Sequence, residues 1–173
     1  SPDSRSVRQR LGDALFTADP AQRIRLQQAS LAMLLMIASA GVLVYAAQVA
    51  GTATGYVVAW TLLSLGGLVT MFVAIRSGWS RRFADPSLTL PQMLYAITSV
   101  AAAYAMAGPV RGATFAVLMV ILMFGMFQLR PRVVGAVSVY ALAVFAAVMA
   151  WQASRNPQVF APAVEVGHFL MLV

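Results

Sequence analysis

Glu165 and His168 are the two side chains of this sequence best suited to chemistry. His168 is the only histidine, and both residues lie in an apolar stretch. Their spacing of three places them on one face of a helix. A carboxylate beside an imidazole at a membrane can relay protons, sense pH or, through the imidazole, ligate haem. Both residues fall within a turn of the predicted outer surface, where water can solvate them, so we favour a structural pair at the helix start over these sensing roles.

Arg111 is a third candidate residue. It lies in the segment Gly108-Pro-Val-Arg-Gly112, which predicts a tight turn. An arginine in such a turn can bind an anionic ligand or a lipid headgroup, or it can face solvent, and we favour the solvent-facing interpretation. We therefore treat Glu165, His168 and Arg111 as candidates for sensing or for binding an unidentified small ligand.

Catalysis and metal binding are not predicted for this chain. It has no cysteine and a single histidine, which excludes thiolate metal sites and a zinc site built from protein ligands alone. It shows no glycine-rich phosphate loop, no Ser/His/Asp set and no paired carboxylates. We expect no catalytic residue, metal or cofactor within the chain.

The composition predicts a membrane protein. Of the 173 residues, 61% are hydrophobic and only 10% are charged, with a mean hydropathy of +0.80, whereas about 25% of residues are charged in soluble domains. The basic residues are all arginines, and they punctuate the apolar runs instead of forming one patch. This pattern favours membrane lipid, and not nucleic acid, as the surrounding partner.

Six apolar stretches predict an all-α polytopic bundle with six transmembrane spans, over residues 30–50, 56–75, 90–107, 113–129, 133–153 and 163–173. Residues 1–29 are predicted to be a cytoplasmic N-terminal segment in which a short amphipathic helix fits. The sixth stretch reaches about 16 Å, half a bilayer. We therefore expect the sixth span to be truncated and the polypeptide to continue beyond Val173.

Two short motifs predict helix starts. Asp19-Pro20-Ala21-Gln22 supplies a cap followed by proline, and Thr89-Leu90-Pro91-Gln92 has the pattern of a capping box with Thr89 as the cap. Between the second and third spans lies the most polar internal segment, which carries Trp79 and Phe83. We expect this segment to lie along the inner membrane surface.

The arginines also predict the topology. Ten of the twelve lie before the first span or in the connections that return to that side, and only Arg111 and Arg155 lie on the other side. Positive residues concentrate on the cytoplasmic side of membrane proteins. We therefore expect a multi-pass protein of the bacterial inner membrane, with the N-terminus and the C-terminal continuation in the cytoplasm.

Two stretches carry a resemblance to a known family: RSGWSRRFADPSLTLPQ over residues 76–92, and residues 108–132, which contain GPVRG and FGMFQLRPR. They resemble the membrane-embedded sensor region that precedes the GGDEF domain in proteobacterial diguanylate cyclases. The resemblance implies a dimeric signalling protein. Its cytoplasmic domain would condense two GTP into cyclic di-GMP with Mg²⁺. That domain's signature motif is absent from this sequence, so no catalytic residue is transferred.

The resemblance thus predicts a sensory and dimerisation module of a membrane-bound diguanylate cyclase, with Mg²⁺ and GTP bound only in the cytoplasmic domain. Similar membrane regions also precede histidine kinases, and that alternative stays open. A transporter or a membrane binding protein is the second alternative. The stimulus is not implied by the resemblance.

Overall fold

The computed structural model describes residues 20–173, with side chains described from residue 23 onward, and this part of the chain is helical without strands. The α-helices are α2 (Pro20–Ala50), α3 (Thr54–Arg76), α4 (Thr89–Met106), α5 (Thr114–Gln128), α6 (Pro131–Arg155) and α7 (Pro162–Leu172). Two short 3₁₀ helices, η1 (Trp79–Arg82) and η2 (Gly108–Ala113), lie in the connections. The predicted all-α fold is confirmed for these residues, and α2 begins at Pro20 as expected. The segment predicted as a possible amphipathic helix before residue 20 lies outside the described residues.

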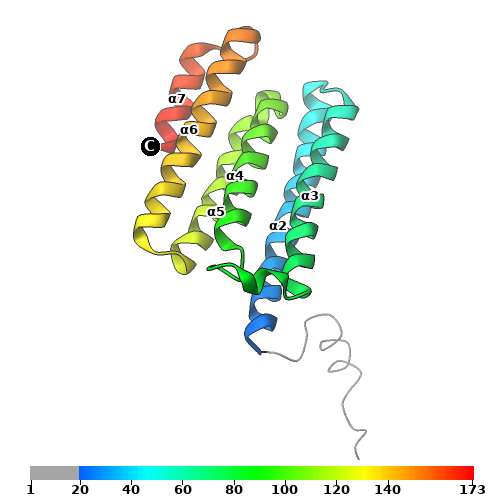
Figure 1. The fold of residues 1–173 in the computed structure, drawn as a ribbon. Coiled ribbons are helices and arrows are strands. Elements are labelled where there is room, and N and C mark those ends of the chain that lie inside the picture. The colour runs from blue at the N-terminus through cyan, green and yellow to red at the C-terminus, as the bar shows by residue number, and fades with distance from the viewer. Residues whose placement is uncertain (1–19) are drawn as a thin grey trace, which may run out of the picture.

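The helices form three antiparallel pairs that lie side by side, α2 with α3, α4 with α5 and α6 with α7 (Figure 1). Helix α4 is central, because it packs against α2, α3, α5 and α6. The larger apolar core lies between α4, α5 and α6, around Tyr104 and Phe145, which are fully buried. A second core joins α2, α3 and α4 around Trp60. The fold therefore assembles on both sides of α4.

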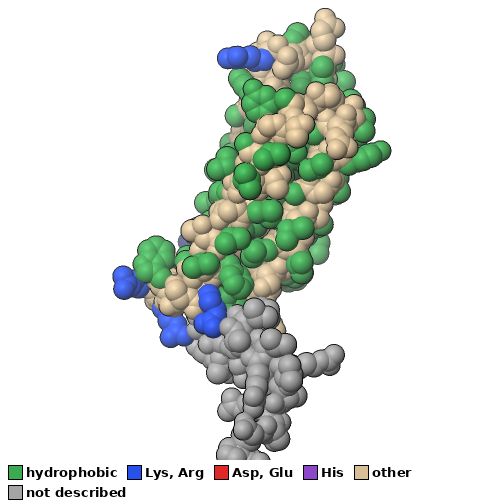
Figure 2. Space-filling model, turned by 90° about the vertical axis from the view of Figure 1, so that its right-hand side faces the viewer, with side chains coloured by type: hydrophobic (Ala, Val, Ile, Leu, Met, Phe, Trp, Pro, Cys, Tyr) green, Lys and Arg blue, Asp and Glu red, His purple; other side chains and the backbone are tan. Residues whose placement is uncertain are grey.

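The outer surface of the bundle suits a membrane. Four helical segments are long and apolar enough to cross one: Arg23–Ala50, Thr54–Arg76, Gly108–Gln128 and Pro131–Arg155. Their outward faces carry exposed large hydrophobic side chains, and Figure 2 shows hydrophobic side chains over one face with arginines at its two ends. Every predicted span forms a helix, but the enclosed α4 and the 11-residue α7 are not among these four. Six crossings therefore remain a prediction.

The start of α4 is at Thr89 as expected, but the predicted capping box is wrong. The Asp85 carboxylate caps the helix, because it accepts a hydrogen bond from the Thr89 backbone N–H at 2.6 Å and two more from neighbouring backbone N–H groups. Leu88, with a left-handed φ of 51°, turns the chain into the helix. The hydroxyl of Thr89 instead donates to Gln128 of α5. Asp85 thus fixes the connection to the first turn of α4.

A close approach at the opposite end of the bundle positions η2. Gly108 has a φ of 53°, and a side chain there would collide with Ala50 at the end of α2. The Thr52 hydroxyl donates to the backbone carbonyl of Met106 at 2.9 Å and so occupies an acceptor at the end of α4. Only glycine fits both the backbone conformation and the space at this point. The result is a fixed position for Arg111, three residues further on.

Candidate functional site

The structure brings the three predicted site residues together around a fourth, Tyr104. Arg111 comes from η2, Glu165 and His168 come from one face of α7, and Tyr104 comes from the last turn of α4. The side chains of α7 thus share one polar cluster with residues of α4 and η2 that lie 54 to 64 positions earlier in the sequence. We call these four residues the polar network.

The Arg111 guanidinium and the Glu165 carboxylate form a buried ion pair. Nη2 and Nε of Arg111 both donate to Oε1 of Glu165, at 2.7 and 3.0 Å. Nη1 donates to the Gly108 carbonyl at 2.9 Å, so the guanidinium is also anchored to its own turn. Only 6% of the arginine side chain and 5% of the glutamate side chain are exposed. Each charge therefore depends on the other for its stabilisation.

Tyr104 connects the ion pair to His168. Its hydroxyl donates to Oε2 of Glu165 at 2.6 Å and lies 2.7 Å from Nδ1 of His168. A tyrosine hydroxyl has a single proton to donate. Because that proton is used on Glu165, Nδ1 of His168 must carry a hydrogen and donate it to the Tyr104 oxygen. The same geometry leaves Nε2 of His168 free of any bond to these residues.

Aromatic rings enclose the network and keep water away from its centre. Phe160 lies under the guanidinium, with its ring centre 4.7 Å from the central carbon of Arg111. Phe115 stacks on Tyr104 at 5.6 Å and meets the His168 ring edge-on at 5.4 Å. His168 is the most exposed member, with 21% of its side chain accessible. A change at the surface can therefore reach the network through His168.

The sequence predicted part of this site. The shared face of Glu165 and His168 is confirmed by their common partner and by a distance of 3.9 Å between Nδ1 and Oε1. The favoured solvent-facing interpretation of Arg111 is wrong, and so is the expectation that water solvates Glu165, because both side chains are buried. Tyr104 was not predicted. One signal could have indicated Tyr104. It is a tyrosine in an apolar stretch, near the end of the predicted span that leads into the turn with Arg111.

The hydrogen-bond donors of Arg111 and Tyr104 in the network are used on Glu165 and on the Gly108 carbonyl. Among residues 20–173, no group of three or more His, Cys, Asp or Glu side chains is placed to hold a metal ion. The Glu165 oxygens already accept three hydrogen bonds. A ligand that binds here would have to compete for one of these bonds.

Comparison with known proteins gives no match to a protein-family model, to a curated protein or to a solved structure.

Proposed function

We propose that this chain is the membrane sensory and dimerisation module of a bacterial inner-membrane diguanylate cyclase. The resemblance of residues 76–92 and 108–132 to such sensor regions supports the proposal. The observation that carries it in the structure is the buried polar network, because it ties the last helix, α7, to two other segments near the end of the bundle. A cytoplasmic domain that follows α7 in a longer polypeptide would bind GTP and Mg²⁺ and would condense two GTP into cyclic di-GMP.

The network supplies a two-state element that a stimulus can bias. Helix α7 packs along α6, and its polar side chains Glu165 and His168 bond to Tyr104 and Arg111. A ligand or a change in the membrane that replaces one of these bonds would favour a second position of α7. A ligand shifts such an equilibrium only by its difference in affinity for the two positions. Movement of α7 against its copy in a dimer would then change how the two cyclase domains meet.

Sequencing of the gene beyond the codon for Val173 separates this proposal from its alternatives. A soluble domain of about 160 residues with a Gly-Gly-Asp/Glu-Glu-Phe motif after Val173 is the expected result, since domains of 100–200 residues are typical. A kinase domain with a phosphorylatable histidine would replace the cyclase by a histidine kinase. Further membrane spans would instead favour a transporter, and either result would refute the cyclase.

The regulatory role needs a test with the full-length polypeptide. Its cyclic di-GMP synthesis in lipid nanodiscs is compared with that of a version from which residues 20–173 have been removed. We expect the truncated enzyme to lose its dependence on dimer contacts in the membrane and to change in specific activity. Equal activity and equal regulation of the two proteins would refute a sensory role for this region.

A further inference from the structure

A cleft separates α2 from α5 on the side of the bundle away from the polar network. Both helices pack against α4 but not substantially against each other, so α4 and Leu68 of α3 form the floor between them. The cleft encloses about 80 Å³ and is partly open to the outside of the bundle. A pocket that engulfs a compact ligand usually has about 300–1,000 Å³. This cleft therefore suits a thin chain that lies in it with one side exposed.

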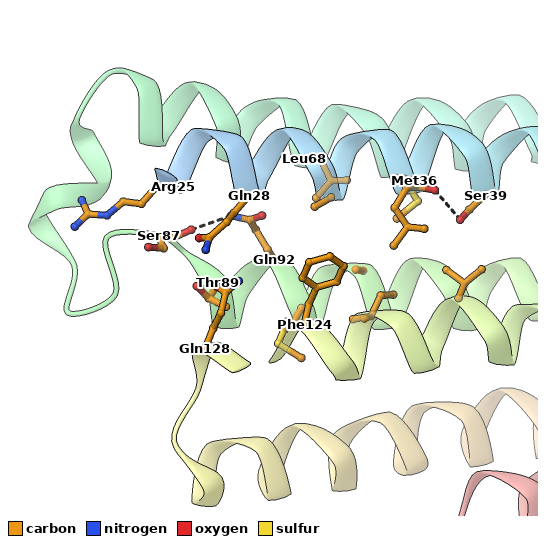
Figure 3. Close-up of a pocket in the computed structure, with 16 residues that line it drawn as sticks. Arg25, Gln28, Met36, Ser39, Leu68, Ser87, Thr89, Gln92, Phe124 and Gln128 are labelled. Atoms are coloured by element: carbon orange, nitrogen blue, oxygen red, sulfur yellow. Dashed lines mark hydrogen bonds between the residues drawn. The ribbon is translucent and has the colours of Figure 1, made fainter. Parts of the chain in front are cut away.

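One end of the cleft is polar and cationic. Figure 3 shows that this end is formed by the side chains of Arg25, Gln28, Ser87, Thr89, Gln92 and Gln128. The Gln92 amide donates to the Ser87 carbonyl, and Thr89 donates to Gln128. Within the described part of the chain, no hydrogen bond or ion pair occupies the Arg25 guanidinium. Arg25 and the amide groups thus offer hydrogen-bond donors to an anionic group.

The charge at this end of the bundle matches an anionic headgroup. Seven of the nine arginines in residues 20–173 lie at this end, in the first turns of α2, from the last residue of α3 through η1, and on either side of Pro131 at the start of α6. Among residues 20–173, the one acidic residue at this end is Asp85, which is engaged in capping α4. Arginines near a membrane surface attract anionic lipids by about 1 kcal/mol each.

The rest of the cleft is apolar and has the length of one lipid chain. Beyond the polar end, Met36 and Phe124 line its walls and Leu68 lies on its floor (Figure 3). Its lining on α2 runs from Arg25 to Ser39, a rise of about 21 Å at 1.5 Å per residue. One leaflet of a bilayer is about 15 Å of hydrocarbon, with the headgroup layer outside it. The cleft therefore spans one headgroup and one leaflet.

We infer that the cleft between α2 and α5 binds one anionic phospholipid of the adjacent leaflet, with its headgroup on Arg25 and one acyl chain along Phe124. Polar recognition at the arginine end and chain packing beyond it are both required. A free soluble phosphate compound would use only the polar recognition at the arginine end and would leave the apolar part of the cleft exposed. This binding site is independent of the cyclase assignment.

Native mass spectrometry of the detergent-solubilised chain tests the headgroup contact. Dioleoyl phosphatidylglycerol is titrated against dioleoyl phosphatidylcholine, which has the same chains, and against glycerol phosphate, which has none. We expect one tightly bound phosphatidylglycerol, and we expect Arg25→Gln to weaken it about tenfold, as for the loss of one charge-assisted contact. The control Arg82→Gln changes the same charge at the same end outside the cleft, and most of the preference for phosphatidylglycerol should remain. Equal losses in both variants, or equally tight binding of glycerol phosphate, would overturn the assignment.

A second pair of variants tests the chain. Ala32 lines the cleft on α2, whereas Ala38 on the same helix is exposed on the bundle surface. Ala32→Phe should block the cleft and weaken binding of both lipids, while Ala38→Phe should leave both unchanged. Thermal unfolding of each variant shows whether it is folded. If the Ala32→Phe protein does not fold, the comparison of Arg25→Gln with Arg82→Gln decides. Unchanged lipid binding by a folded Ala32→Phe protein would refute the cleft as the site.

Discussion

Removal of either member of the Arg111–Glu165 pair is expected to destabilise the bundle strongly. In Arg111→Met, the Glu165 carboxylate loses two of its three hydrogen bonds and keeps only the Tyr104 hydroxyl. In Glu165→Leu, the guanidinium keeps only its bond to the Gly108 carbonyl. The surviving charge in either variant is about 95% enclosed, so water cannot replace the lost partner without a rearrangement. Breaking a buried ion pair costs about 3–5 kcal/mol.

The double variant Arg111→Met/Glu165→Leu should recover most of this loss. It leaves no unpaired charge, and apolar side chains of similar volume occupy the same space between Phe160 and Tyr104. Replacement of a whole buried ion pair by apolar residues is often neutral or stabilising. The two substitutions should therefore couple by about 3 kcal/mol or more in a double-mutant cycle.

Equilibrium unfolding in mixed micelles with increasing sodium dodecyl sulfate, followed by tryptophan fluorescence, measures the four free energies of the cycle. Arg155→Met is the control, because Arg155 is exposed beside Trp151, and it should change the free energy of unfolding by about 0.5 kcal/mol at most. A double variant whose loss equals the sum of the two single losses would refute the buried ion pair as described.

Three further predictions concern the frame of the bundle. Asp85→Ala should lower the free energy of unfolding by about 1–2 kcal/mol, and Thr89→Ala by clearly less, because the Asp85 carboxylate caps α4; equal losses by denaturation would contradict this. Gly108→Ala should cost about 1–3 kcal/mol through its backbone strain and the collision with α2, whereas Gly112→Ala, with open space around it, should cost less than 1 kcal/mol. Alkaline phosphatase fused in the α3–α4 or α5–α6 connection should be inactive, because both connections are predicted to lie in the cytoplasm. Activity at either position would contradict the predicted topology.

The helices could be predicted from the sequence because they follow from local composition. Apolar stretches of 15 or more residues form helices whichever neighbours they pack against. Proline and glycine in the turns mark where these helices begin and end. The start of α4 at Thr89 was found in this way. Its cap was assigned to the wrong side chain, because Asp85 reaches the helix only through the conformation of the connecting loop, with Leu88 in the left-handed region.

The site was only half predictable for a different reason. Glu165 and His168 are three residues apart, so helical geometry alone brings them together. Arg111 and Tyr104 join them through contacts between segments 54 to 64 residues apart, which a single sequence does not encode locally. From the sequence, a lone arginine in a turn is predicted to face solvent. The burial of Arg111 follows only from the docking of α7 beside η2.

The most direct test of the proposal that the polar network controls an output is cyclic di-GMP synthesis by the full-length polypeptide in nanodiscs. His168→Gln keeps a hydrogen-bond donor near Tyr104 but removes the ring that contacts Phe115, and Glu165→Gln keeps the shape of the side chain but removes the charge that pairs with Arg111. Arg155→Gln serves as the control. We expect both network variants to change the rate of synthesis several-fold while the control does not, and His168→Gln, which leaves the Arg111–Glu165 pair intact, should do so while it is inserted and folded as the parent protein is. Rates identical to the parent in both variants would contradict the proposal.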